Sequence, residues 1–147
     1  MKQVNEMKIS FLSRSSNESF ARVAVSAFVS QLDPTIDVLT DIKTALSEAV
    51  TNCIVHAYRE TLGTIYITVK IFENGRVQIR IRDKGCGIDN VKQAMEPLFT
   101  TAGGERAGLG FAVMESFMDK LRVSSKPGKG TTITMEKQVA LKAKDNG

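Results

Sequence analysis

The chain lacks the features of several large protein classes. No apolar run approaches the roughly 20 residues that a membrane-spanning helix needs, and no signal peptide precedes the first predicted strand. Only two cysteines are present, Cys53 and Cys86, and neither has cysteine or histidine partners at metal-ligand spacing. We therefore expect a cytoplasmic protein with two reduced thiols, and neither a membrane protein nor a disulfide scaffold.

The chain carries a net positive charge, which is unevenly distributed along the sequence. The net charge is +4, with 7 basic and 8 acidic residues in positions 1–75 and 13 basic and 8 acidic residues in positions 76–147. Such asymmetry can indicate nucleic-acid binding. Aromatic side chains are not interleaved among the basic residues, however, so an acidic protein partner and a polyanionic nucleotide are favoured over direct nucleic-acid binding.

The spacing of apolar residues predicts two helices after a first strand near residues 7–11. Ser15 and Glu18 form a potential capping box at the start of the first helix, which Asp33-Pro34 would end. Its expected buried face consists of Phe20, Val23, Ala24, Ala27, Phe28 and Leu32. The second helix should begin at Thr35 or Ile36, with an apolar stripe of Ile42, Ala45, Leu46, Ala49, Cys53 and Ile54.

Further strands are expected at residues 65–71, 77–81, 121–123 and 133–135, and a helix at 111–120. Asn74-Gly75 predicts a hairpin in which both turn residues have positive φ. The order indicates an α/β (α+β) two-layer sandwich: a mixed, mostly antiparallel sheet with helices on one face and a polar opposite face. We expect one domain over residues 1–147, with a frayed tail from about residue 140.

Three polar residues at four-residue spacing mark the second helix. Glu48, Asn52 and His56 would share one helix face. A carboxylate and an amide directed into one cleft could supply a general base, Glu48, and a neutral oxygen ligand for Mg²⁺, Asn52. The alternative is a solvated helix face without chemistry. His56, the sole histidine, is given no acid–base role.

A glycine-containing turn follows a predicted strand at Asp83-Lys-Gly85-Cys-Gly87. The Asp83 carboxylate could accept a hydrogen bond from the amino group of adenine, whereas guanine presents a carbonyl at that position. The glycines would let the backbone approach the base, and Thr131 could add a hydroxyl to the same edge. The alternative is an ordinary turn with an aspartate cap.

A second glycine pair, Gly108-Leu109-Gly110, precedes the predicted third helix. Backbone amides at a helix start can hold phosphate. The loop before it contains Thr100, Thr101, Gly103 and Gly104 and is expected to act as a lid, with Arg106 as the nearest cation for the γ-phosphate.

At these motifs the chain resembles the GHKL ATPase/kinase superfamily, whose fold is the Bergerat α/β sandwich. Glu48 and Asn52 match its N box, and the two glycine motifs match its glycine boxes. Over about residues 7–137 the chain more closely resembles the anti-sigma factor serine kinases of endospore-forming bacteria. That likeness also rests on residues 47–52, 56–58, 97–101, 105–106 and 130–132.

The resemblance implies a homodimer that binds ATP or ADP with Mg²⁺. It would inhibit a sporulation sigma factor and phosphorylate a serine of an anti-anti-sigma factor. Arg22 matches a partner-contacting arginine of the family, and Glu105 and Arg106 match lid positions. Two departures stand out: Ala102 replaces a common lid lysine, and Lys84 stands where an acidic residue is usual.

Four rival interpretations remain open at this point. A stress-response anti-sigma kinase of the same superfamily and a non-catalytic, ATP-dependent interaction module use the same fold. A sensor histidine kinase would need an upstream helical hairpin carrying a phosphoacceptor histidine, whereas His56 lies inside the nucleotide helix. A nucleic-acid-binding sheet would show DNA affinity that falls steeply with salt.

Overall fold

The computed structural model describes residues 2–59, 61–88, 90–91 and 110–141. Within these ranges its elements follow the predicted order closely. They are β1 Gln3–Leu12, α1 Ser16–Val29, the 3₁₀ turn η1 Ser30–Leu32, α2 Ile36–Thr51, the π-helix η2 Asn52–Ala57, β2 Thr64–Phe72, β3 Arg76–Asp83, α4 Phe111–Phe117, β4 Lys120–Lys126 and β5 Gly130–Gln138.

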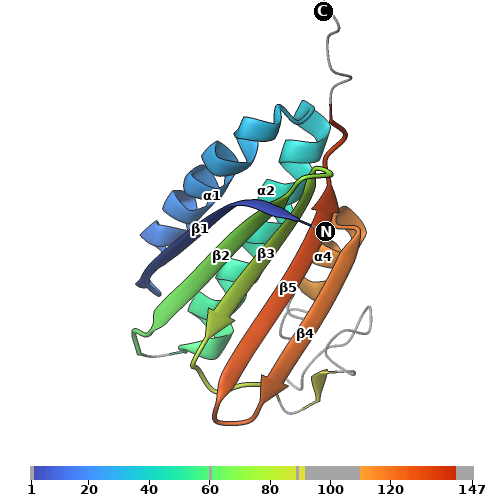
Figure 1. The fold of residues 1–147 in the computed structure, drawn as a ribbon. Coiled ribbons are helices and arrows are strands. Elements are labelled where there is room, and N and C mark those ends of the chain that lie inside the picture. The colour runs from blue at the N-terminus through green and yellow to red at the C-terminus, as the bar shows by residue number, and fades with distance from the viewer. Residues whose placement is uncertain (1, 60, 89, 92–109, 142–147) are drawn as a thin grey trace, which may run out of the picture.

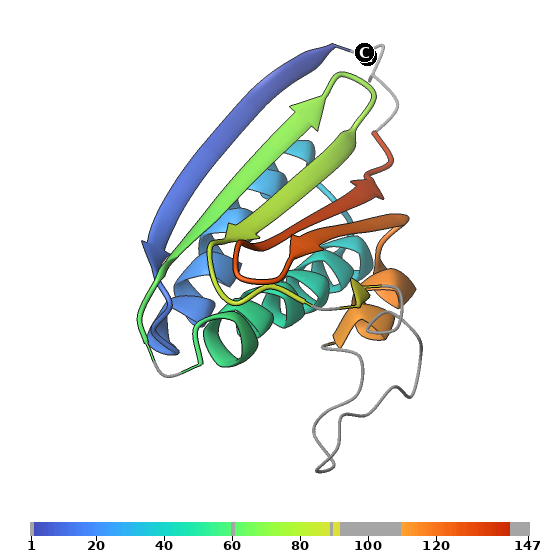
Figure 2. The same ribbon diagram turned by 90° about the horizontal axis from the view of Figure 1, so that it is seen from below.

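The strands form one sheet in the order β1-β2-β3-β5-β4, and every neighbouring pair is antiparallel. Figures 1 and 2 show α1, α2 and α4 together on one face of this sheet. The predicted two-layer α/β sandwich is thus confirmed for the described residues. Among these residues, no helix has the length and apolarity needed to span a bilayer.

The core lies between the sheet and α2. Alternate residues of β2 and β3 point inward and are buried, as the period-2 pattern predicted. The predicted stripe of the second helix is also buried, apart from Ile54, which is partly buried against the core. The hydroxyl of Thr35 caps α2 by accepting a hydrogen bond from the Val38 amide at 3.2 Å. This packing fixes the position of the polar face of α2 relative to the end of β3.

The predicted buried face of α1 was wrong in part, although its members Phe28 and Leu32 do pack against the core. Phe20 and Val23 are 51% and 63% exposed, whereas the buried residues are Ala21, Val25 and Val29. Ala21, Val25 and Val29 let α1 lie close to the layer beneath it, and Phe20 and Val23 lie toward solvent. The Phe20 ring instead packs edge-on against Phe11 of β1, with ring centroids 6.0 Å apart.

The predicted capping box is also absent from α1. The Ser15 side chain makes no capping hydrogen bond, and the Glu18 carboxylate lies 3.5 Å from the Arg22 guanidinium, one helical turn away. Side-chain pairing along the helix therefore replaces the expected bond from Glu18 back to the start of the helix.

One turn and one helix end also differ from the prediction. In the β2–β3 hairpin only Gly75 has a positive φ, of 86°, and its amide donates to the Phe72 carbonyl at 2.9 Å. This is a three-residue loop with a glycine in the left-handed region, not the predicted two-residue turn. Helix α4 ends at Phe117, because Met118 adopts extended backbone before β4 begins.

Candidate functional site

The second helix changes its winding where the predicted polar residues lie. Its α-helical part ends at Thr51, and Asn52–Ala57 forms a π-helix in which the Tyr58 amide donates to the Cys53 carbonyl at 3.1 Å. Such wider turns occur frequently at functional sites. The periodicity of 3.6 residues therefore holds from Glu48 to Asn52 but does not extend to His56, so the predicted three-residue face is incomplete.

Asn52 is the most unusual polar residue of this segment. It is 6% exposed, and neither its Oδ1 nor its Nδ2 has a hydrogen-bond partner within the described part of the chain. Burial of an unpaired amide costs free energy, so such a residue in a folded protein calls for a ligand, ion or water. A neutral oxygen of this kind suits Mg²⁺, which takes few protein ligands and keeps waters and phosphate oxygens.

The Asp83 carboxylate closes the buried end of β3 and is 4% exposed. Its Oδ1 accepts hydrogen bonds from the Gly85 amide at 2.9 Å and from the Thr131 amide at 3.2 Å. Its Oδ2 accepts from the Cys53 thiol at 3.5 Å. Burial raises the pKa of Asp83, although these three donors act in the opposite direction.

The Cys53 thiol joins the two halves of the site. Its contact with Asp83 places the end of β3 against the π-helix that also carries Asn52. Burial, and next the negative charge of Asp83, raises the pKa of Cys53 well above its ordinary value, so the sulfur stays protonated and donates.

Tyr58 also contacts the segment that follows Asp83. Its hydroxyl donates to the Thr64 carbonyl at 2.8 Å and accepts from the Lys84 amide at 2.6 Å. Burial raises the pKa of Tyr58, with the Lys84 amide opposing it. The hydroxyl therefore stays protonated and bridges β2 to the residue that follows Asp83.

The glycines of the loop permit close backbone contacts. A Cβ on Gly85 would meet the carbonyl of Ala57, and one on Gly87 would meet the carbonyl of Lys126. The loop is held on both sides, because the Cys86 amide donates to Ala57 at 3.1 Å and the Gly128 amide donates to Cys86 at 2.6 Å. Only glycine allows the loop after Asp83 to lie between η2 and the β4–β5 turn.

Gly87 and Gly128 form a matched pair for testing this close contact. Both have φ of 76°, but a Cβ on Gly128 would meet nothing within 4 Å. Alanine at either position carries the left-handed backbone strain of about 1–2 kcal/mol. We expect Gly87→Ala to lower the free energy of unfolding by a further ~1–3 kcal/mol through overpacking, measured by urea denaturation. Equal losses in the two variants would mean that the loop does not depend on this contact.

Thr131 was predicted to present a hydroxyl to the base edge. In the structure its amide holds Asp83, while its Oγ1 lies 2.8 Å from the Ser125 Oγ, and either atom can donate. Ser125 also accepts from the Ile88 amide at 2.8 Å, so β4 supports the glycine loop. The contribution of Ser125 was not predicted, because Ser124-Ser125 within a short strand carries no distinctive pattern.

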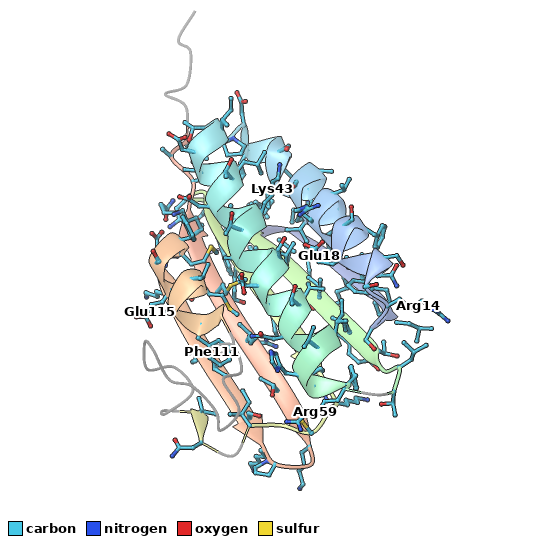
Figure 3. The ribbon with its side chains drawn as sticks, turned by 180° about the vertical axis from the view of Figure 1, so that it is seen from behind. Arg14, Glu18, Lys43, Arg59, Phe111 and Glu115 are labelled. Carbon is cyan, nitrogen blue, oxygen red and sulfur yellow. The ribbon has the colours of Figure 1, made fainter. Side chains whose placement is uncertain are left out.

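A polar groove of about 480 Å³ lies between α1 and α2. It is lined by Arg22, Thr40, Lys43, Thr44, Ser47 and Glu48. Figure 3 views the molecule from this side, with Glu18 of α1 and Lys43 of α2 labelled on neighbouring helices. The groove brings together Arg22 and Glu48, which the sequence predicted separately as a partner contact and a base.

Several predicted residues lie outside the described part of the chain: Thr100, Thr101, Glu105, Arg106, Gly108 and Leu109. The departure at Ala102 lies there too. Gly110 is described, and it adopts φ of 75° immediately before α4. Among the described residues, no group of three or more acidic, histidine or cysteine side chains is arranged to hold a metal ion. A metal at this site would thus depend on few protein ligands.

Comparison with known proteins gives matches over nearly the whole chain. Residues 13–137 match the family described as the histidine kinase-like ATPase domain. The chain is 55% identical over 140 residues to the anti-sigma F factor of Caldanaerobacter subterraneus subsp. tengcongensis, covering 95% of this chain and 97% of that protein. It is 57% identical over 137 residues to the anti-sigma F factor of Clostridium beijerinckii, covering 91% and 94%, respectively.

Among solved structures, the RsbU and RsbW domains of Rv1364c from Mycobacterium tuberculosis superpose with a TM-score of 0.67 at 18% identity. The match covers 98% of this chain but only 35% of that one. At this identity the superposition supports the shared α/β fold and nothing finer.

Proposed function

Since the chain belongs to the anti-sigma F factors, within the family of histidine kinase-like ATPase domains, we propose that it binds a sporulation sigma factor and is a protein serine kinase. In this proposal it uses Mg-ATP to phosphorylate a serine of an anti-anti-sigma factor. The observation that carries the proposal is that two buried polar side chains, Asn52 and Asp83, lie on adjoining segments of the fold. The Asn52 amide, which has no hydrogen-bond partner in the described part of the chain, and the Asp83 carboxylate lie on segments joined by the Cys53–Asp83 contact.

Asp83 is proposed to read adenine. Its Oδ1 is occupied by two backbone amides, which leaves Oδ2 to accept from an exocyclic amino group beside the thiol. The glycines at 85 and 87 and the hydroxyl pair of Ser125 and Thr131 complete the base side of the site.

Asn52 is proposed to hold Mg²⁺ through its amide oxygen. The ion would neutralise charge on the phosphates when bound. Gly108, Leu109 and Gly110 would contribute backbone amides to the phosphates, and Thr100, Thr101 and Arg106 would close over them. All of these phosphate contacts, Arg106 included, remain predictions from the sequence.

Glu48 is proposed as the general base. The oxygen of the acceptor serine would attack the γ-phosphorus as the bond to the β-phosphate oxygen breaks, and the serine proton would pass to the Glu48 carboxylate. The products are phosphoserine and ADP. Because phosphoryl transfer depends mostly on positioning and electrostatics, the approach of the serine matters as much as its proton.

The groove between α1 and α2 supports a docking path for the acceptor. It carries two cationic side chains, Arg22 and Lys43, and extends to Glu48. The Arg22 side chain is 41% exposed, so its planar guanidinium can pair with a partner carboxylate. Sigma factor and acceptor would compete for this surface, with Glu105 as a further contact.

Arg22→Glu is expected to weaken both partners by about tenfold or more, because a reversed charge repels an acidic partner surface. Nucleotide affinity should stay within about 0.5 kcal/mol of the parent value, since the substitution lies outside the base site. Titration of each partner and of ADP by calorimetry tests this. Arg14→Glu, an exposed position before α1, is the charge-matched control. Lost nucleotide binding with intact partner binding would contradict the docking assignment.

We also propose that the chain forms a homodimer through an apolar strip at the α1–β1 edge. Leu12, Phe20 and Val23 are all exposed there, at 45%, 51% and 63%. A strip of this kind on α1, next to an edge strand, resembles the apolar centre of an interface between copies.

Val23→Glu is expected to shift the chain from dimer to monomer, because dimerisation would bury the new charge unpaired. Light scattering coupled to size-exclusion chromatography measures the change. Ile36→Glu is the control, since Ile36 is also exposed, at 83%, but lies at the start of α2. A dimer that withstands Val23→Glu would place the interface elsewhere.

Two measurements test the proposed function as a whole. Calorimetry with Mg-ADP and Mg-GDP should show binding of the adenine nucleotide in preference. A pull-down from sporulating cells with Mg-ATP or Mg-ADP should recover a sigma factor and a small acceptor protein, and the acceptor should gain phosphate on serine. Partner binding without phosphate transfer would leave a non-catalytic interaction module.

A further inference from the structure

The two oxygens of the Asp83 carboxylate are held in different ways. Oδ1 accepts from two backbone amides of different segments, Gly85 in the loop after β3 and Thr131 in β5. Oδ2 accepts from the Cys53 thiol at 3.5 Å. A carboxyl group rotates readily about its terminal torsion, so contacts at both oxygens are needed to fix its plane.

The chemistry of the thiol suits this position. A carboxylate accepts hydrogen bonds only, so the thiol must be the donor. A thiol is a weak donor, and it occupies one of the two lone pairs of Oδ2. The oxygen therefore keeps its charge and one lone pair available for a second donor, which an amino group of adenine would supply.

We infer that Cys53 is a positioning residue for adenine recognition: its thiol orients the Asp83 carboxylate so that Oδ2 faces the exocyclic amino group. The inference rests on the proposed adenine-binding function. Cys53 is fully buried in the core and follows Asn52, whose amide has no hydrogen-bond partner among the described residues. In this inference the buried thiol holds Asp83 and does not itself contact the nucleotide. It is thus distinct from a residue that binds the base directly.

Packing alone is the competing explanation, and two substitutions separate it from positioning. Cys53→Ala removes the donor and some volume, whereas Cys53→Ser restores a donor in a similar volume. Val50→Ala is the control for packing, because Val50 is fully buried on the preceding α-helical turn and has no polar group to lose.

The test measures dissociation constants of ADP and of inosine diphosphate, which carries a carbonyl in place of the amino group. Cys53→Ala should reduce the preference for ADP by about 3- to 10-fold, part of the effect of a hydrogen bond to a charged group. Affinity for inosine diphosphate should change less than twofold. Cys53→Ser and Val50→Ala should keep the parent preference.

Three results would overturn the inference: an unchanged preference in Cys53→Ala, an equal loss for both nucleotides, or a Cys53→Ser variant that behaves like Cys53→Ala. A parent chain that does not distinguish the two nucleotides would instead contradict the proposed adenine site.

A second readout requires no nucleotide. The S–H stretching band of Cys53, assigned by its loss in Cys53→Ala, should move to higher frequency in Asp83→Asn, because a neutral amide accepts more weakly than a carboxylate. A band that does not move would show that the thiol does not donate to Asp83. This outcome would overturn the inference whatever the nucleotide specificity.

Discussion

Glu48→Gln is expected to lower the rate of serine phosphorylation by about 10²–10⁴-fold, the usual contribution of a general base. Glutamine keeps the size and polarity of the side chain but cannot take the proton of the acceptor hydroxyl. Glu48 lines the α1–α2 groove one helical turn before Asn52, whereas the proposed contacts to the base lie at Asp83 and the loop that follows it. Affinities for nucleotide and for both partners should therefore remain close to those of the parent chain.

Single-turnover phosphorylation of the acceptor, with saturating partner and Mg-ATP, measures this rate apart from binding. Glu115→Gln is the control, because Glu115 is an exposed glutamate on α4 and its substitution removes the same charge. Transfer by Glu48→Gln at the parent rate would mean that another group accepts the proton. Joint loss of transfer and partner binding would instead assign Glu48 to docking.

Asp83→Asn should separate nucleotide binding from stability. ATP affinity is expected to fall by about 1–3 kcal/mol, because the amino group of adenine loses a charged acceptor. Affinity for GTP should not fall with it, since guanine offers no amino group at that position. Calorimetry with both nucleotides checks this, and equal affinities of the parent chain for ATP and GTP would refute the role of Asp83.

Stability of the nucleotide-free chain should not fall together with the affinity for ATP. The pKa of Asp83 is raised by burial above its ordinary value of 3.8, so the folded chain holds this proton more tightly than the unfolded chain does. Ionisation of Asp83 therefore costs stability at neutral pH, and stability is regained as the pH falls through the raised pKa. The neutral amide of the Asp83→Asn variant carries no such cost, so its urea unfolding at neutral pH should show no loss of stability and a weaker acid dependence.

The sequence predicted most of the sheet and of α2 because burial imposes a clear period. Ile65 to Ile71 alternate strictly, and Ile42 to Ala49 recur at helical spacing, so a single face satisfies each pattern. In α1 the pattern was ambiguous. Both the stripe containing Phe20 and Val23 and the stripe containing Ala21 and Val25 fit a helical period, and close packing selected the smaller one.

The site was predictable in its parts and not in its connections. Asp83 and Asn52 were identified by motifs, but the hydrogen bond that links Cys53 to Asp83 spans 30 positions and has no local signal. The π-helix was missed because one added residue per turn alters no composition or capping pattern. Tyr58 was found only within a family motif, and its bridge from Thr64 to Lys84 depends on the tertiary fold.

The arrangement around Lys84 gives the chain a built-in optical probe. The sequence has no tryptophan and two tyrosines, and both tyrosines contact Lys84. The Tyr58 hydroxyl accepts from its amide, and the Lys84 ammonium lies 5.4 Å from the centre of the Tyr66 ring. Intrinsic fluorescence at tyrosine wavelengths thus arises only beside the loop that follows Asp83, so titrations there need neither a label nor a substituted residue.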